Sequence, residues 1–185
     1  MKRLAPGLTL GAVLLITALE LRRQGRLWVC ACGHVQLWSG NIFSVENSQQ
    51  LFDPYTFTHL EHGLVLFGLL ALVLSRVNPP WRFVIALSAE CFWEIIENSA
   101  TVIDRYRTET ISLGYTGDTV LNSFGDILAC ATGVALAPVL GLKRALIVVM
   151  VMELALIVWI RDSLLLNVVM LVLPVPWIRA WQAGN

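Results

Sequence analysis

Long apolar stretches separated by short polar breaks dominate the chain. A helix that crosses the hydrocarbon layer of a membrane needs roughly 20 mostly apolar residues, and several stretches approach that length. They are residues 4–21, 58–77, 81–103, 118–140, 145–160 and 163–178. The pattern predicts an all-α fold, a polytopic membrane helical bundle that forms one domain over residues 1–185.

The last two stretches leave the number of spans open. At about 1.5 Å per residue each rises only about 24 Å, which is less than a hydrocarbon core about 30 Å thick. One helix through both would place Arg161 and Asp162 in the middle of the membrane. Five transmembrane helices with one interfacial helix and six transmembrane helices both fit the pattern, and we favour six.

Basic residues give a weak preference for one orientation. Lys2 and Arg3 precede the first stretch, but no small-x-small cleavage pattern follows it, so we expect a retained anchor. Lys and Arg residues in the short loops slightly favour an N-terminus inside the cell. Residues 22–57 then form a long outer loop.

The composition agrees with a membrane protein. Hydrophobic residues make up 57% of the chain and charged residues 14%, with a formal net charge of zero. An average soluble domain has about 25% charged residues. These values exclude a disordered chain, a collagen and a nucleic-acid binder that works through a basic surface.

The few ionisable residues within the apolar stretches are regularly spaced. Residues three or four apart lie on one face of a helix, and ionisable residues within a membrane are costly enough to indicate a functional site. The polar stripes consist of His59 and His62 in the second stretch, Glu90, Glu94 and Glu97 in the third, and Asp118, Asn122 and Asp126 in the fourth.

The alternation of spans places these stripes near one membrane face. The start of the second stretch, the end of the third and the start of the fourth all lie on the same side. Because lipid cannot solvate polar groups, we expect the stripes to turn toward one another. With the N-terminus inside, this face is the periplasmic side of a bacterial inner membrane.

Two interpretations of the clustered side chains stay open. Imidazoles and carboxylates suit a divalent metal such as Zn, Mn or Mg, and helical bundles build metal sites from such residues. A buried hydrogen-bonded network that fixes helix packing, at about 1 kcal/mol per bond, is the alternative. The candidate catalytic residues and metal ligands are His59, His62, Glu94, Glu97, Asp118 and Asp126.

The predicted loop over residues 98–117 adds candidate substrate-binding residues. Arg105 and Arg107 have the chemistry to hold an anionic group bidentately, or to neutralise neighbouring acids. Asn98 and Asn122 complete the candidate substrate-binding set.

The outer loop carries Cys30 and Cys32, followed by His34. Two thiolates and one imidazole do not complete a tetrahedral metal site. A disulfide is allowed if the loop is periplasmic, and apolar packing of two reduced cysteines is the third interpretation.

The motifs in this order resemble a known group. Thr58-His59-x-x-His62-Gly63, Glu90-x-x-x-Glu94-x-x-Glu97-Asn98, Arg105-x-Arg107 and Asp118-x-x-x-Asn122-x-x-Gly125-Asp126 resemble the VanZ-like superfamily of small bacterial membrane proteins. Cys30-x-Cys32-Gly33, Leu37-Trp38-x-Gly40 and Asp53-x-Tyr55-Thr56 add a closer resemblance to an uncharacterised proteobacterial family of multi-pass inner-membrane proteins. The resemblance implies a polytopic inner-membrane protein and a link to the cell envelope, but it supplies no reaction.

Two functions from different classes fit these observations. The first is a metal-assisted hydrolase or transferase that acts on an envelope lipid head group, with a carboxylate as general base. The second is a non-catalytic membrane protein that binds an anionic lipid or envelope precursor, or that is a subunit of a membrane assembly. Both place the protein in the lipid bilayer with no nucleic-acid partner.

Overall fold

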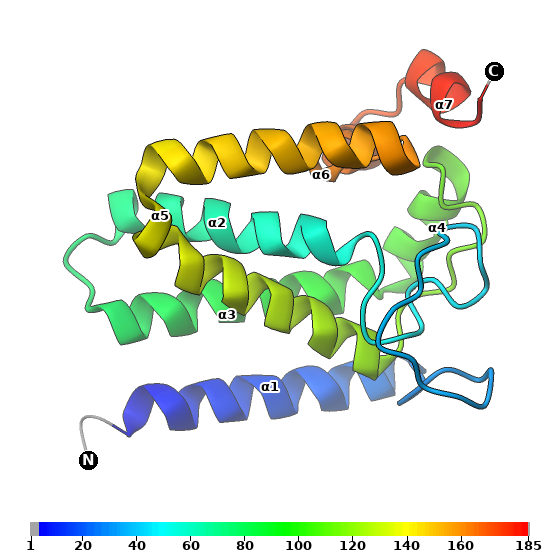
Figure 1. Ribbon diagram of the computed structural model, residues 1–185. Helices are drawn as coiled ribbons and strands as arrows, with labels where there is room; N and C mark the ends of the chain where they lie inside the picture. The colour runs from blue at the N-terminus through cyan, green and yellow to red at the C-terminus, as the bar shows by residue number, and fades with distance from the viewer. Residues whose placement is uncertain (1–3, 185) are drawn as a thin grey trace.

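The computed structural model describes residues 4–184 and contains seven helices in that range. A single β-bridge joins Trp38 to Phe52, and the described residues form no β-strand. The expected all-α fold is confirmed (Figure 1). The helices are α1 (Ala5–Arg23), α2 (Thr56–Val73), α3 (Pro79–Glu97), α4 (Ala100–Glu109), α5 (Val120–Ile160), α6 (Leu164–Val172) and α7 (Pro176–Gln182).

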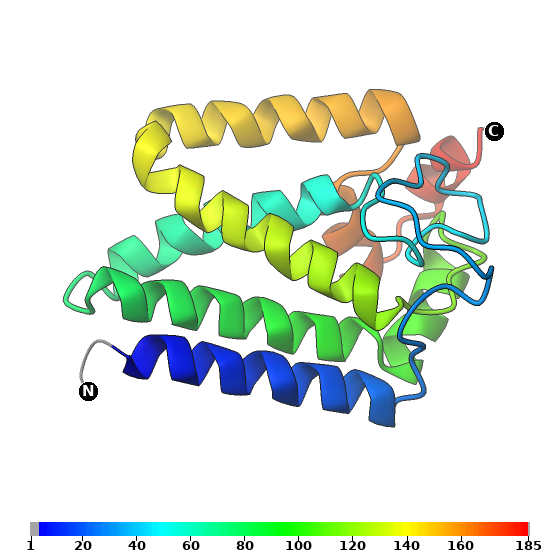
Figure 2. The ribbon, with the colours of Figure 1, turned by 60° about the horizontal axis from the view of Figure 1, so that its bottom comes forward.

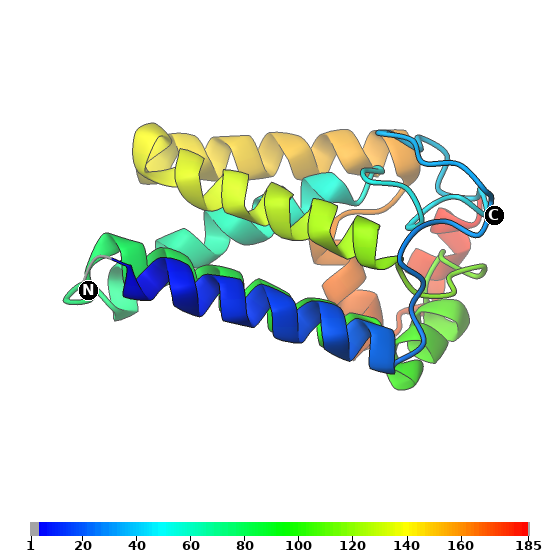
Figure 3. The ribbon, with the colours of Figure 1, turned by 90° about the horizontal axis from the view of Figure 1, so that it is seen from below.

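The four long helices lie alongside one another in a bundle, with the long loop before α2 and the short helices gathered at one end (Figures 1 and 2). Helix α1 packs along α3, as the view from below shows (Figure 3). Helix α5 bends back on itself at Gly141, where φ is 71° and ψ is 162°. The bend separates the two predicted stretches 118–140 and 145–160, so their boundary is where the sequence placed it.

Three helices, α1, α2 and α5, are long and apolar enough to cross a membrane. Their length and composition fit a membrane protein. Many of their apolar side chains are exposed, as expected for a surface covered by lipid, including Leu72 at 77% and Val158 at 85%. The count of five or six transmembrane helices stays a prediction.

The predicted span over residues 163–178 is wrong as one continuous helix. Helix α6 has nine residues, which corresponds to a rise of about 14 Å, too short for a hydrocarbon core about 30 Å thick. Pro174 and Pro176 follow it, and proline cannot continue a helix because it lacks an N–H. Helix α7 therefore begins afresh at Pro176.

The predicted helix 81–103 and the loop expected at 98–117 also need correction. Helix α3 ends at Glu97, and the side chain of Ser99 accepts a hydrogen bond from the N–H of Val102, which caps a new helix. Helix α4 thus occupies the first half of the predicted loop. The change of direction at Asn98 turns that side chain into the bundle, where it is 1% exposed.

Two glycines set the distance between α2 and the first half of α5. A Cβ atom at Gly63 would lie 2.0 Å from the carbonyl oxygen of Cys130, and one at Gly133 would lie 2.2 Å from that of Leu60. Small residues allow membrane helices to approach this closely. Because His59 precedes Gly63 by one turn, the close approach also brings the start of α2 against the start of α5.

Asp162 ties the C-terminal helices to the rest of the fold. Its buried carboxylate accepts hydrogen bonds from the Tyr55 hydroxyl, the Asn167 amide and the Gln182 amide, each at 3.1 Å. These donors belong to the end of the outer loop, to α6 and to α7. One carboxylate therefore joins the two C-terminal helices to the end of the outer loop, which is more than 100 residues away in the sequence.

The stability of this junction is expected to depend on pH. Burial raises the pKa of Asp162 from 3.8 to about 7. Between these values the folded chain binds a proton that the unfolded chain has lost, so the free energy of unfolding falls as the pH rises from about 4 to about 7. Melting temperatures measured from pH 4 to pH 9 should fall less steeply with pH in this window for Asp162→Asn than for the unchanged protein. Asp104→Asn, at an exposed position, should keep the slope of the unchanged protein.

Candidate functional site

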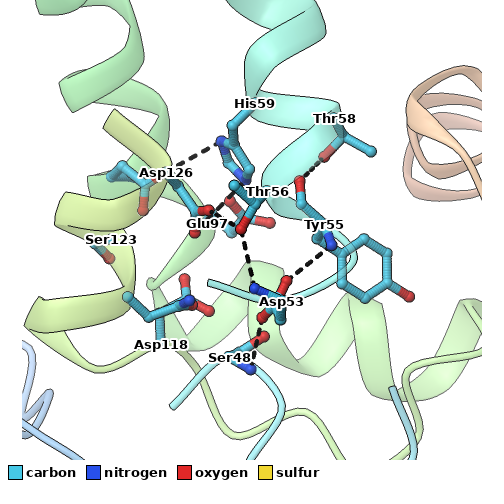
Figure 4. A network of polar contacts seen from close by, with 12 residues as sticks. Ser48, Asp53, Tyr55, Thr56, Thr58, His59, Glu97, Asp118, Ser123 and Asp126 are labelled. Carbon is cyan, nitrogen blue, oxygen red and sulfur yellow. Dashed lines mark hydrogen bonds and ion pairs between the residues drawn. The ribbon is translucent and has the colours of Figure 1, made fainter. Parts of the chain in front are cut away.

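The three polar stripes meet in one cavity of about 210 Å³, where α2 begins, α3 ends and α5 begins. Figure 4 shows His59 of α2 with Asp126 and Glu97 beside it. The convergence expected from the alternation of spans is therefore present in the structure. The ionisable side chains that line the cavity are Asp53, His59, His62, Glu97, Asp118 and Asp126, together with Tyr55, Tyr106 and Tyr115.

His59 lies at the centre of the acidic groups. Its Nδ1 atom is 2.6 Å from Oε1 of Glu90 and 3.4 Å from Oε1 of Glu94, and its Nε2 atom is 3.9 Å from Oδ2 of Asp126. The residue is 5% exposed. One imidazole thus faces carboxylates from α3 on one side and from α5 on the other.

Glu90 bridges the two histidines of α2. Nδ1 of His62 lies 3.0 Å from Oε2 of Glu90, and the two imidazole centroids are 5.0 Å apart. Trp93 stands edge-on to the His62 ring at 6.1 Å. Glu90 belongs to the predicted acidic stripe but is absent from the candidate ligand set, although its spacing with Glu94 already placed it on the same face.

Glu94 lies 3.4 Å from Nδ1 of His59, but its oxygens accept no hydrogen bond from the described residues. Its side chain is fully buried, and neither carboxylate oxygen accepts a hydrogen bond from any residue between 4 and 184. One oxygen of Glu97 accepts a hydrogen bond from the Tyr106 hydroxyl at 2.7 Å, while the other has no donor within that range. A buried carboxylate without donors is costly unless a charge compensates it.

Two groups of side chains around His59 are each close enough to share one metal ion. His59, Glu94 and Glu97 form one group, and His59, His62 and Glu90 form the other, with ligand atoms within 4.8 Å of one another. His59 belongs to both. Of the six predicted ligands, Asp118 and Asp126 lie in neither group, although both line the cavity, whereas Glu94 belongs to a group but does not line the cavity.

Asn98 holds Asp118 in place instead of facing the cavity. Its amide donates to Oδ2 of Asp118 at 2.7 Å, and its Oδ1 accepts the N–H of Asp118 at 2.7 Å. Burial, and the nearby charge of Glu97, raise the pKa of Asp118 to about 7. Asn122 lines the cavity, and its amide donates to the carbonyl of Gln50 at 2.9 Å.

The outer loop contributes Asp53, which the sequence analysis did not select. The carboxylate is 1% exposed and accepts the N–H groups of Ser48 and Tyr55, both at 2.8 Å. Burial raises the pKa of this group. Thr56, the first residue of α2, accepts the N–H of Asp53 at 3.0 Å and donates to Asp126 at 3.3 Å, which joins the loop to the site (Figure 4). The motif Asp53-x-Tyr55-Thr56, directly before a predicted helix, is the feature of the sequence that could have identified Asp53 as a site residue.

Gly125 lets the loop lie against α5. A Cβ atom at this position would be 2.0 Å from the carbonyl oxygen of Leu51. Only a residue without a side chain allows this contact, which explains a glycine directly before Asp126.

The structure does not bring the two arginines to the cavity. The guanidinium of Arg105 donates to the carbonyl oxygens of Leu171 at 2.9 Å and Val172 at 3.4 Å, at the C-terminal end of α6. Arg107 is exposed. Neither forms an ion pair with a residue in the described range, and neither lines the cavity. The last carbonyls of a helix lack internal partners, which explains why Arg105 binds there.

Arg105→Ala should therefore loosen α6 and leave the acidic cluster intact. We expect a loss of about 1 to 2 kcal/mol for the two hydrogen bonds from a charged donor. Hydrogen exchange should become faster over α6, while α2 and α3 keep their protection. Arg107→Ala is the matched control and should change neither the free energy of unfolding nor the hydrogen exchange of α6.

Cys30 and Cys32 form a disulfide, which decides among the three interpretations left open. Cys32, His34 and Glu46 also come within metal-binding distance of one another. A sulfur atom in a disulfide is not a thiolate ligand, and His34 instead pairs with Glu46 at 3.2 Å.

Comparison with known proteins places the chain in a family. Residues 21–184 match the family described as "Protein of unknown function (DUF2585)". The UPF0314 protein of Paracoccus denitrificans (strain Pd 1222) is 46% identical over 184 residues, which cover 99% of this chain and 95% of the relative. The UPF0314 protein of Rhizobium meliloti (strain 1021) is 45% identical over 174 residues, which cover 93% and 87%.

No solved structure matches the chain. The resemblance to an uncharacterised proteobacterial family is confirmed by these matches, whereas the resemblance to the VanZ-like superfamily stays a prediction. The chain belongs to the DUF2585 family and is similar to the UPF0314 proteins.

Proposed function

We propose that the acids clustered around His59, which lines the cavity, bind a divalent cation, and that the protein is a membrane hydrolase or transferase acting on an envelope lipid head group. The observation that carries the proposal is Glu94. Its carboxylate is completely buried next to His59 and accepts no hydrogen bond within residues 4–184. A cation at this position would compensate its charge.

The charge balance around the cavity supports a cation. No Lys or Arg of the described chain lines it, and only two imidazoles face the acids. Carboxylates this close together cannot all ionise without a compensating positive charge. The acids of this cluster are Asp53, Glu90, Glu94, Glu97, Asp118 and Asp126.

The donor set narrows the choice of cation. Imidazole together with carboxylate suits Zn or Mn, whereas carboxylates alone suit Mg. His59, Glu94 and Glu97 supply one nitrogen and two carboxylates within 4.8 Å. A site of this type would bind Zn or Mn in preference to Mg.

The carboxylates around the cation have the chemistry of general bases. A divalent cation would act as a Lewis acid and lower the pKa of a nearby water. A carboxylate such as Asp126 accepts the proton as the water oxygen forms a bond to the phosphorus of the head group. The bond from phosphorus to the leaving oxygen breaks, and that oxygen takes the proton back. In a transferase an acceptor hydroxyl replaces the water.

The proposed site lies at the periplasmic face of the bacterial inner membrane. Three apolar helices support the membrane location. The disulfide between Cys30 and Cys32 lies in the loop at the same end of the bundle as the cavity, and disulfides persist in the periplasm.

Titration of the chelator-treated protein with Mn²⁺ tests the proposal. The protein in detergent micelles should bind Mn²⁺ at a protein-dependent site, measured by the loss of the free-ion electron paramagnetic resonance signal. Glu94→Gln should weaken binding by at least about tenfold, equivalent to about 1.4 kcal/mol. Glu109→Gln, away from the cavity, should leave it unchanged.

A non-catalytic hydrogen-bonded network predicts another result. Glu94→Gln would then remove a buried charge, leave the protein equally or more stable, and change no cation affinity. That outcome would overturn the cation site.

A further inference from the structure

Four large apolar side chains line the cavity together with the acids. They are Leu164, Val168 and Leu171 of α6 and Trp93 of α3. Of the residues that line the cavity, only Val168 is exposed, at 47%. The cavity therefore comes closest to the outer surface beside α6.

The outer surface at this point is also apolar. Leu165 and Val172 lie three residues before and four residues after Val168, so all three share one face of α6. Leu165 is 63% exposed and Val172 is 76% exposed. In a membrane protein such a face is covered by lipid, and here it runs directly into the wall of the cavity.

The size of the cavity limits what enters it. At about 210 Å³ it is smaller than the roughly 300–1,000 Å³ of sites that enclose drug-sized ligands. A phosphate-sized head group fits this volume, whereas a head group built of sugars and a peptide does not.

We propose that a phospholipid with a small phosphate head group enters the cavity sideways, between α3 and α6. The head group lies among the acids and the bound cation, and the acyl chain leaves past Trp93 and Val168 into the bilayer. This inference rests on the proposed function and deepens it, because it names the substrate class and the route.

Helix α6 is held at both ends, which fixes the width of this opening. The N–H of Leu165 donates to Oε1 of Glu153 at 3.0 Å, and Arg105 holds the carbonyl of Leu171 at 2.9 Å. The side chain at position 168 therefore controls access without taking part in either anchor. A larger side chain there narrows the opening.

Native mass spectrometry of the delipidated protein tests the route, with dioleoyl phosphatidic acid as the probe. The unchanged protein should retain one phosphatidic acid more firmly than its annular lipids. Val168→Trp should lower this retention by about tenfold, the factor expected for a clash of about 1.4 kcal/mol. Val172→Trp is the matched control on the same face and should retain the lipid.

Each outcome separates this inference from the cation site. Equal retention by both tryptophan variants would overturn the lateral route. So would tight binding of inorganic phosphate with no retained phosphatidic acid, because the ligand would then be a soluble anion. Lipid retained with and without chelator would uphold the route but contradict the bound cation. Mn²⁺ bound without lipid would uphold the cation and overturn the route.

Discussion

Replacing Gly133 with alanine is expected to lower the free energy of unfolding by about 3 kcal/mol. The new Cβ atom would lie 2.2 Å from the carbonyl oxygen of Leu60 and 3.0 Å from Cα of Gly63. Both contacts are with backbone, which no side-chain rotation relieves. Helices α2 and α5 must therefore separate, and His59 moves away from Asp126. Denaturant titration of the purified protein measures the loss.

The same substitution at Gly68 should have the opposite sign. No atom lies within 4 Å of a Cβ built at this position of α2. Alanine is preferred over glycine inside a helix by about 0.8–1.0 kcal/mol, so Gly68→Ala should be neutral or slightly stabilising. Equal effects of the two alanines would contradict the close approach of α2 and α5.

Replacing His59 with alanine is expected to have the largest effect at the site. It leaves Glu90, which is 1% exposed, and Glu94, which is fully buried, without the imidazole that faces both. Removing one partner of a buried ion pair costs about 3–5 kcal/mol. Because His59 belongs to both candidate metal groups, cation binding should be lost as well.

His62 and His34 provide graded controls for this prediction. His62 is partly exposed, and Glu90 keeps His59 as a partner when His62 is removed. His62→Ala should therefore cost less than His59→Ala in unfolding experiments. His34→Ala, in the outer loop, should leave both stability and Mn²⁺ binding almost unchanged. A ranking with His34→Ala as the most damaging variant would place the site elsewhere.

The convergence of the polar stripes could be predicted from the sequence because it follows from the helical spacing of the polar residues and from the alternating direction of the spans. Acidic residues recur with helical spacing at Glu90, Glu94 and Glu97, and alternating spans bring one end of each helix to the same face. Helix boundaries followed the apolar pattern closely for α1 and α2. Charged side chains within apolar stretches carry information that ordinary surface charges do not.

The remaining features depend on side-chain contacts that the hydrophobic pattern does not encode. A hydrogen bond to Ser99 starts α4 inside a predicted loop. The path of the outer loop places Asp53 in the cavity through hydrogen bonds with Ser48 and Tyr55. Arg105 was expected to hold a substrate because of its charge, but its position on α4 directs it to the end of α6. No local spacing reveals these distant partners.

X-ray absorption at the zinc edge of the Zn²⁺-loaded protein tests the central claim most directly. We expect imidazole nitrogen together with carboxylate oxygen at about 2.0–2.2 Å from the zinc, and loss of the imidazole signal in His59→Ala. His34→Ala should leave the spectrum unchanged. A spectrum that His59→Ala leaves unaltered, or one that shows sulfur at about 2.3 Å, would contradict a cation site among α2, α3 and α5.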